Sequence, residues 1–160
     1  MPIFANDILQ ELIARQETLS VGESCTGGGL ANEITANAGV SRVFLGSVTT
    51  YANSAKEKLL KVPTEILATK GAVSEEVALL MAKNCRELFS STWSLSTTGI
   101  AGPGGGTKEK PVGLVWIGLA GPNTLLAQSF IFANISRLEH RQKTIEQAFE
   151  ILKQGIHRAV

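Results

Sequence analysis

The chain has 160 residues, of which 44% are hydrophobic and 18% charged, and it contains fifteen Lys and Arg residues against fourteen Asp and Glu residues. This composition is typical of an ordinary globular protein, and we expect one domain over residues 1–160. The near-neutral charge argues against a nucleic-acid-binding protein, and no apolar run reaches the roughly 18 residues that a membrane span needs. We therefore expect neither a nucleic-acid nor a membrane partner.

Cysteine and histidine are too few to build a disulfide framework or a zinc site. The chain contains Cys25 and Cys85, and its two histidines lie near the C-terminus. No spacing of the Cys/His type that binds zinc is present. The N-terminal residues also lack the basic segment that begins a secretory signal. We expect a cytoplasmic protein without a metal ion and without a cofactor.

The first part of the chain alternates between helical and strand-like patterns. Apolar residues at helical spacing, short β-rich runs and a terminating proline predict a helix over 3–17, a strand over 18–22, a helix over 26–36, a strand over 42–51 and a helix over 53–62 that Pro63 ends.

The second part of the chain continues the alternation and adds a hairpin. Ser74 is a good N-cap for a helix that extends to about residue 90. The remaining pattern predicts a strand over 93–99, a glycine-rich loop over 100–111, strands over 112–120 and 124–133 that meet at a turn over 121–123, and a helix over 137–158. This order predicts an α/β fold, a three-layer sandwich with a mixed, mostly parallel sheet between helices.

The turn in VGESCTGGGLANEI, residues 21–34, holds a serine where the chain leaves a predicted strand and enters a predicted helix. Such a position lies at the sheet edge where open α/β folds bind ligands, close to free N–H groups of the helix. Ser24 is then either a nucleophile or only a helix cap. Cys25 is the rival nucleophile, although a lone cysteine is more often a buried apolar residue.

A serine or cysteine nucleophile requires a base, and no histidine lies near in the sequence. Tyr51, Lys56 and Lys58 are the candidates. A lysine serves as a base only if burial lowers its pKa enough to give a neutral amine. The alternative is that each lysine lies on a solvated helix face.

Two further segments are candidates for binding an anion. The loop TTGIAGPGGGTKEKP, residues 97–111, is rich in glycine and can form backbone anion nests, but it lacks the register of a P-loop. Arg137 and Arg141 form an i,i+4 pair suited to phosphate or carboxylate, or else a solvated pair.

The motifs resemble the CinA C-terminal domain family, the nicotinamide-nucleotide amidases. The resemblance covers about residues 5–155 and is carried, in this order, by ESCTGG, VTTYANSAKEKLL, GAVSEEVALLMA, TTGIAGPGGG and EKPVGLVWIGLA.

The resemblance implies metal-free hydrolysis of the carboxamide of nicotinamide mononucleotide to nicotinate mononucleotide and ammonia. It implies that Ser24 is the nucleophile and that Tyr51 and Lys56 activate it. Members of the family commonly self-associate, so it also implies a homo-oligomer. The small-molecule nucleotide substrate is expected to contact Thr26, Gly27, Gly28, Thr98, Gly99, Gly102, Gly104, Gly105 and Arg137.

One segment departs from the family pattern, which has a Gly-Asp-Arg run at the start of the last helix. Ile135 and Ser136 occupy the Gly-Asp positions, and Arg137 is retained. Because a β-branched residue is strained at positive φ, we expect another loop path, with Ser136 still able to cap the helix and Arg137 aimed away from the substrate. Weak turnover follows from this expectation.

The alternative function is a nucleotide-binding or regulatory module without turnover. A DNA-binding competence factor is a third hypothesis, which the near-neutral net charge disfavours.

Overall fold

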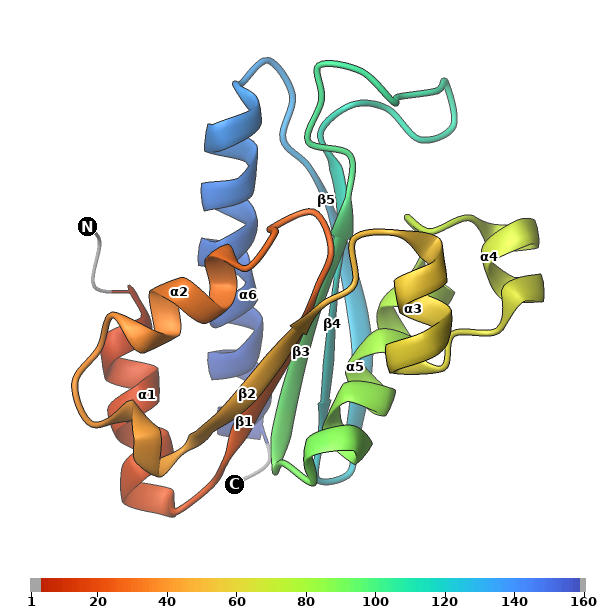
Figure 1. The fold of residues 1–160 in the computed structure, drawn as a ribbon. Coiled ribbons are helices and arrows are strands. Elements are labelled where there is room, and N and C mark those ends of the chain that lie inside the picture. Colours follow the sequence, from red (N-terminus) through yellow and green to blue (C-terminus); the bar gives the residue numbers. More distant parts are fainter. Residues whose placement is uncertain (1–3, 159–160) are drawn as a thin grey trace.

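The computed structural model describes residues 4–158 and has helices on both sides of one sheet (Figure 1). In chain order its elements are α1 (Phe4–Arg15), β1 (Leu19–Glu23), α2 (Gly29–Thr35), the 3-10 turn η1 (Val40–Arg42), β2 (Phe44–Thr49), α3 (Asn53–Leu60), α4 (Thr64–Lys70), α5 (Glu75–Phe89), β3 (Trp93–Gly99), β4 (Leu114–Gly121), β5 (Thr124–Ile131) and α6 (Arg137–Arg158).

The sheet has five strands in the order β2-β1-β3-β4-β5. Strand β1 pairs in parallel with both β2 and β3, whereas β4 is antiparallel to β3 and to β5. Four strands therefore point in one direction and only β4 is reversed, which confirms a mixed, mostly parallel sheet. Strands β4 and β5 form the expected hairpin.

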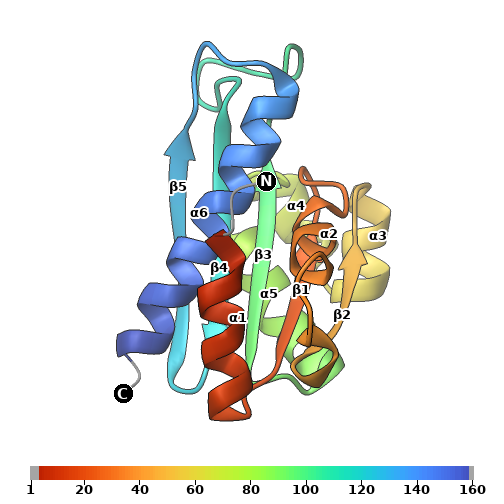
Figure 2. The same cartoon turned by 90° about the vertical axis from the view of Figure 1, so that its left-hand side faces the viewer.

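The two faces of the sheet carry different helices. A Cβ on Gly118 would lie 2.4 Å from the carbonyl oxygen of Ala78 in α5, whereas Gly155 of α6 packs against the next strand residue, Leu119. Consecutive strand residues point to opposite faces, so α5 and α6 cover opposite sides. Figure 2 shows α1, α2 and α6 together on one side, and α3 and α4 lie with α5 on the other (Figure 1). This arrangement confirms the three-layer sandwich.

The start of α2 and the presence of α4 differ from the sequence-based prediction. Helix α2 begins at Gly29 with Gly28 as its N-cap, so the alternative that Ser24 is only the cap of this helix does not hold. Helix α4 was not predicted, because Pro63 was interpreted only as a terminator; its backbone (φ −61°, ψ 137°) is also a suitable N-cap for the next helix. Residue 3, in the predicted first helix, lies outside the described residues.

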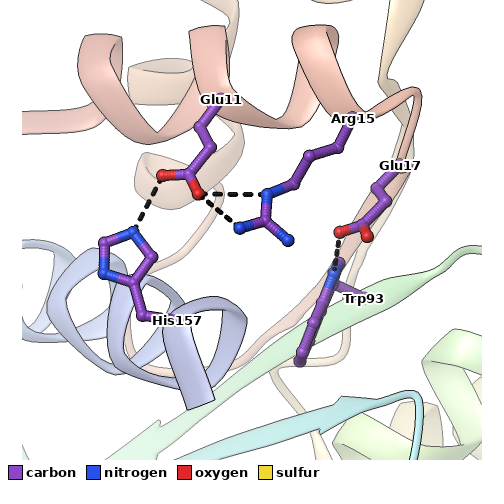
Figure 3. Close-up of polar contacts among 5 residues, drawn as sticks. All are labelled: Glu11, Arg15, Glu17, Trp93 and His157. Carbon is purple, nitrogen blue, oxygen red and sulfur yellow. Dashed lines mark hydrogen bonds and ion pairs between the residues drawn. The ribbon is translucent and has the colours of Figure 1, made fainter. Parts of the chain in front are cut away.

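At the amino ends of β1 and β3, polar contacts fix α1 to the rest of the molecule (Figure 3). The Glu11 carboxylate lies 2.8 Å from Arg15 and 2.9 Å from Nε2 of His157, near the end of α6. The indole N–H of Trp93, which begins β3, donates to Glu17 at 2.7 Å. These contacts lie at the end of the sheet opposite the loops that follow β1, β2 and β3.

Over residues 4–158, none of the helices has both the length and the apolar character to span a bilayer. The same residues contain no group of three or more His, Cys, Asp or Glu side chains placed to hold a metal ion.

Candidate active site

A pocket of about 260 Å³ lies where the loops after β1, β2 and β3 meet. This is the edge at which parallel strands present their carboxyl ends, the usual ligand position in open α/β sheets. The predicted site residues that line the pocket are Ser24, Tyr51, Lys56, Thr98, Gly99, Gly102, Gly104, Gly105 and Arg137.

Ser24 and Lys56 are in direct contact in this pocket. The amine nitrogen of Lys56 lies 3.0 Å from Oγ of Ser24, although 32 positions separate the two residues in the chain. Lys56 also donates to the backbone carbonyls of Thr50 at 2.9 Å and Tyr51 at 3.1 Å. Ser24 is 8% exposed and Lys56 only 1%, so the contact is almost completely removed from bulk water.

Burial lowers the pKa of the Lys56 amine below its ordinary value of 10.5. Among the described residues no carboxylate lies within ion-pair distance of Lys56 to offset this effect. The Lys56 amine therefore loses its proton at a lower pH than the amine of a solvated lysine does. Lys58, the other candidate on α3, is exposed and does not line the pocket.

Cys25 lines the same pocket but is a poor nucleophile. Its side chain is 6% exposed, and desolvation raises the pKa of the thiol to about 12. Since the thiolate is the reactive form, this shift disfavours Cys25 as a nucleophile at neutral pH. Between the two rival nucleophiles, the environment favours Ser24.

Arg137 lies at the rim of the pocket and contacts two other predicted site residues. One guanidinium nitrogen donates to the carbonyl of Gly102 at 2.7 Å, and the other donates to the hydroxyl of Tyr51 at 2.8 Å. The expectation that Arg137 is aimed away from the pocket is therefore wrong.

The start of α6 explains why Arg137 keeps this position. Asn134 takes the positive φ of 60°, so Ile135 is not strained. Ser136 and Glu139 then form a reciprocal capping box: Ser136 Oγ accepts from the Glu139 N–H at 3.1 Å, and the Glu139 carboxylate accepts from the Ser136 N–H at 2.8 Å.

Thr98 and the glycine-rich segment form another wall of the pocket. The Thr98 hydroxyl donates to the carbonyl of Ala72 at 2.8 Å, which ties β3 to the loop before α5. Gly102 and Gly105 have φ of 84° and 90°, backbone conformations that glycine adopts without strain. The sequence-based prediction missed the remaining pocket residues, which are Asn53, Ala72, Val73, Ile100 and Ala101.

Thr26, Gly27 and Gly28, predicted to contact substrate, are not among the residues that line the pocket. The Thr26 side chain is fully buried, and its carbonyl accepts from Arg141 at 2.8 Å. Arg141 thus contacts the turn after β1 and does not line the pocket, whereas Arg137 does. The two arginines therefore do not form one anion site. The N–H groups of Leu30 and Ala31 bond to the Glu23 carboxylate and are not free for an oxyanion, contrary to expectation.

Comparison with known proteins decides the family. The profile of the CinA C-terminal domain matches residues 3–156, nearly the whole chain. The chain belongs to the CinA C-terminal domain family. A CinA-like protein of Prochlorococcus marinus subsp. pastoris is 53% identical over 116 residues, 72% of this chain and 27% of that protein. A CinA-like protein of Parasynechococcus marenigrum is 44% identical over 153 residues, 95% of this chain and 36% of that protein. The chain thus spans about a third or less of these curated relatives.

Solved structures share the fold of this CinA C-terminal domain. The competence/damage inducible protein CihA from Agrobacterium tumefaciens superposes with a TM-score of 0.92 at 39% identity, covering 94% of this chain and 92% of that one. The competence damage-inducible protein A (ComA) from Klebsiella pneumoniae gives a TM-score of 0.92 at 29% identity, covering 96% and 95%. The α/β architecture with its mixed five-stranded sheet is therefore that of the family.

Proposed function

We propose that this CinA C-terminal domain is an amidase that hydrolyses the carboxamide of nicotinamide mononucleotide to nicotinate mononucleotide and ammonia. The observation that carries the proposal is the 3.0 Å contact between Ser24 Oγ and the buried amine of Lys56 inside the pocket. Amide hydrolysis without a metal requires a nucleophile with an adjacent base, and these two side chains provide both.

The surroundings of Lys56 are suited to a neutral amine that accepts a proton. The carbonyls of Thr50 and Tyr51 are the acceptors for two N–H bonds, which leaves the nitrogen lone pair for the Ser24 hydroxyl. Ser24 Oγ then attacks the carboxamide carbon while its proton passes to Lys56. The protonated lysine returns the proton to the leaving nitrogen, ammonia departs, and water hydrolyses the ester on Ser24 by the same proton path.

Other pocket residues are suited to a nucleotide with an aromatic ring and a phosphate. Ala72, Val73 and Ile100 provide apolar surface for the pyridine ring. Arg137 and the backbone of the glycine-rich segment are placed to bind the phosphate, the first by charge and the second through N–H groups.

Ammonia release from purified protein tests the substrate assignment. Nicotinamide mononucleotide should release ammonia, and nicotinamide, glutamine and nicotinamide riboside should be at least about tenfold poorer in kcat/KM, because the first two lack the nucleotide and the third lacks the phosphate. Equal activity on the riboside would refute phosphate recognition. Activity on glutamine but not on nicotinamide mononucleotide would mean that the proposed substrate is wrong.

The alternative of a binding module without turnover has lost its main support. It depended on a displaced Arg137, which instead contacts Tyr51 at the pocket. Stabilisation of the protein by nicotinamide mononucleotide without any release of ammonia would favour this alternative again.

We also propose that the protein self-associates, which sedimentation of the purified protein would measure.

A further inference from the structure

Glu23, the residue before the proposed nucleophile, has a fully buried carboxylate that the proposed reaction does not use. It accepts three hydrogen bonds: from the N–H of Leu30 at 2.8 Å, the N–H of Ala31 at 3.1 Å and the hydroxyl of Thr26 at 2.5 Å. No cation of the described residues lies within ion-pair distance of it. The carboxylate is therefore compensated by the Ser24 turn and the helix that follows it.

A series of hydrogen bonds connects the Glu23 carboxylate to Ser24 through Thr26 and Thr97. A carboxylate only accepts, so the Thr26 hydroxyl gives its proton to Glu23 and must accept from the Thr97 hydroxyl, 2.8 Å away. Thr97 is fully buried, its Oγ lies 3.4 Å from the Ser24 N–H, and its carbonyl accepts the same N–H at 3.0 Å. The chain of bonds from Glu23 thus ends on the backbone of the nucleophile.

The backbone of Glu23 is connected to the base as well. Its carbonyl accepts from the N–H of Thr50 at 2.7 Å, and the carbonyl of Thr50 accepts from Lys56 at 2.9 Å. Glu23 therefore lies between the strand that carries Ser24 and the loop that holds the Lys56 amine. It is not among the residues that line the pocket, so its carboxylate does not face the space that a substrate is proposed to occupy.

We propose that Glu23 is a positioning residue that holds the Ser24 turn in its reactive conformation through Thr26 and Thr97. The proposal rests on the proposed role of Ser24 as nucleophile. It predicts that loss of the carboxylate impairs the reactivity of Ser24 while substrate binding is unaffected.

Glu23→Gln is the direct test, because glutamine keeps the size but turns one acceptor into an NH2 group that faces the N–H groups of α2. We expect kcat for ammonia release to fall about 100-fold, a typical cost of a misplaced catalytic group, while KM changes by less than about threefold.

A fluorophosphonate probe gives a second readout that is independent of the substrate. Ser24 Oγ forms a bond to phosphorus, fluoride leaves, and the serine proton passes to Lys56. The rate of labelling at Ser24 should fall by a factor similar to that of kcat. If the wild-type protein is labelled but releases no ammonia from nicotinamide mononucleotide, the substrate proposal fails and the labelling rates still decide the role of Glu23.

A matched control separates positioning from a general loss of stability. Ile156 is fully buried near the far end of α6, about 28 Å along the helix from Arg137. Ile156→Ala should lower the melting temperature, yet at a temperature below both transitions it should be labelled at the wild-type rate.

Thr97→Val keeps the proposal testable if Glu23→Gln does not fold, since valine matches threonine in shape. Labelling should slow about tenfold, in line with the loss of one buried hydrogen bond. Combined with Glu23→Gln it should add little, because both changes interrupt the same chain of bonds. Wild-type labelling rates in folded Glu23→Gln or Thr97→Val protein would overturn the proposal, as would the absence of labelling at Ser24 in the wild type.

Discussion

The proposed chemistry depends on which of two adjacent side chains is the nucleophile. Ser24 contacts the Lys56 amine, whereas burial raises the pKa of the Cys25 thiol to about 12. Ser24→Ala should therefore abolish measurable ammonia release, and Cys25→Ala should keep activity within about tenfold of wild type, or about 1.4 kcal/mol. Steady-state kinetics of the two purified variants would measure this. The opposite ranking would make Cys25 the nucleophile.

Lys56 and Lys58 provide an internal comparison for the base. Only Lys56 points into the pocket, and Lys58 is exposed on the same short helix. Lys56→Met should lower kcat about 100-fold or more, the usual range for a lost general base, while Lys58→Met should change it little. Near-normal turnover by Lys56→Met would remove the lysine from the mechanism.

The same burial affects stability in a pH-dependent way. Because the pKa of Lys56 is lower in the folded than in the unfolded protein, the unfolded state binds more protons between the two values. The cost of burying the charged amine is fully present below the folded-state pKa and disappears as the pH approaches 10.5.

Denaturant unfolding of Lys56→Met and wild type at several pH values would measure this cost. The free energy of unfolding of the variant, relative to wild type, should be highest at neutral pH and should decrease as the pH rises toward 10.5. A difference that does not vary with pH would show that Lys56 is not destabilised by its charge.

At the scale of secondary-structure elements, the start of α6 places Arg137 at the pocket rim. Arg137 donates to Gly102 and Tyr51, so Arg137→Ala should lower kcat/KM by roughly 10- to 150-fold, the equivalent of about 1.5–3 kcal/mol for a charge-assisted hydrogen bond. Lys143→Ala, an exposed cation on the same helix, is the matched control and should have little effect. Equal effects would reduce the role of Arg137 to that of net charge.

The Ile135–Ser136 segment is a tolerated variation in this account. Asn134 already takes the positive φ, and Ser136 already caps the helix with Glu139. Changing Ile135→Gly together with Ser136→Asp should therefore alter kcat/KM by less than about threefold, well under 1 kcal/mol. An increase of tenfold or more, measured in the same ammonia assay, would mean that the natural loop does limit activity.

For the whole molecule, the local sequence pattern predicted most of the fold. Apolar periodicity, turn residues and caps are local signals, and within residues 4–158 they located all five strands and five of the six α-helices. Helix α4 was missed because Pro63 ends one helix and begins the next, a double role that the pattern does not distinguish. Helices α5 and α6 pack on opposite faces of the sheet because consecutive residues of β4 point to opposite sides.

The site was less predictable, because its members are distant in sequence. The residues themselves offered Ser24, Cys25 and three possible bases, and only the resemblance to a family joined Ser24 with Lys56. The role of Glu23 was not visible, since a glutamate in a strand gives no signal that its carboxylate is buried. The direction of Arg137 likewise depends on the backbone of Asn134, which no local rule determined.

The central claim is that a buried, neutral Lys56 activates Ser24 for amide hydrolysis. The most direct test is the pH dependence of kcat/KM for ammonia release from nicotinamide mononucleotide, because it reports the ionisation of the free enzyme. Since burial lowers the pKa of Lys56 below 10.5, activity should rise with pH as a single group loses its proton, with a midpoint below 10.5. The residual activity of Lys56→Met should lack this rise. A wild-type profile that is flat or falls over this range, or a rise that persists in Lys56→Met, would contradict the account.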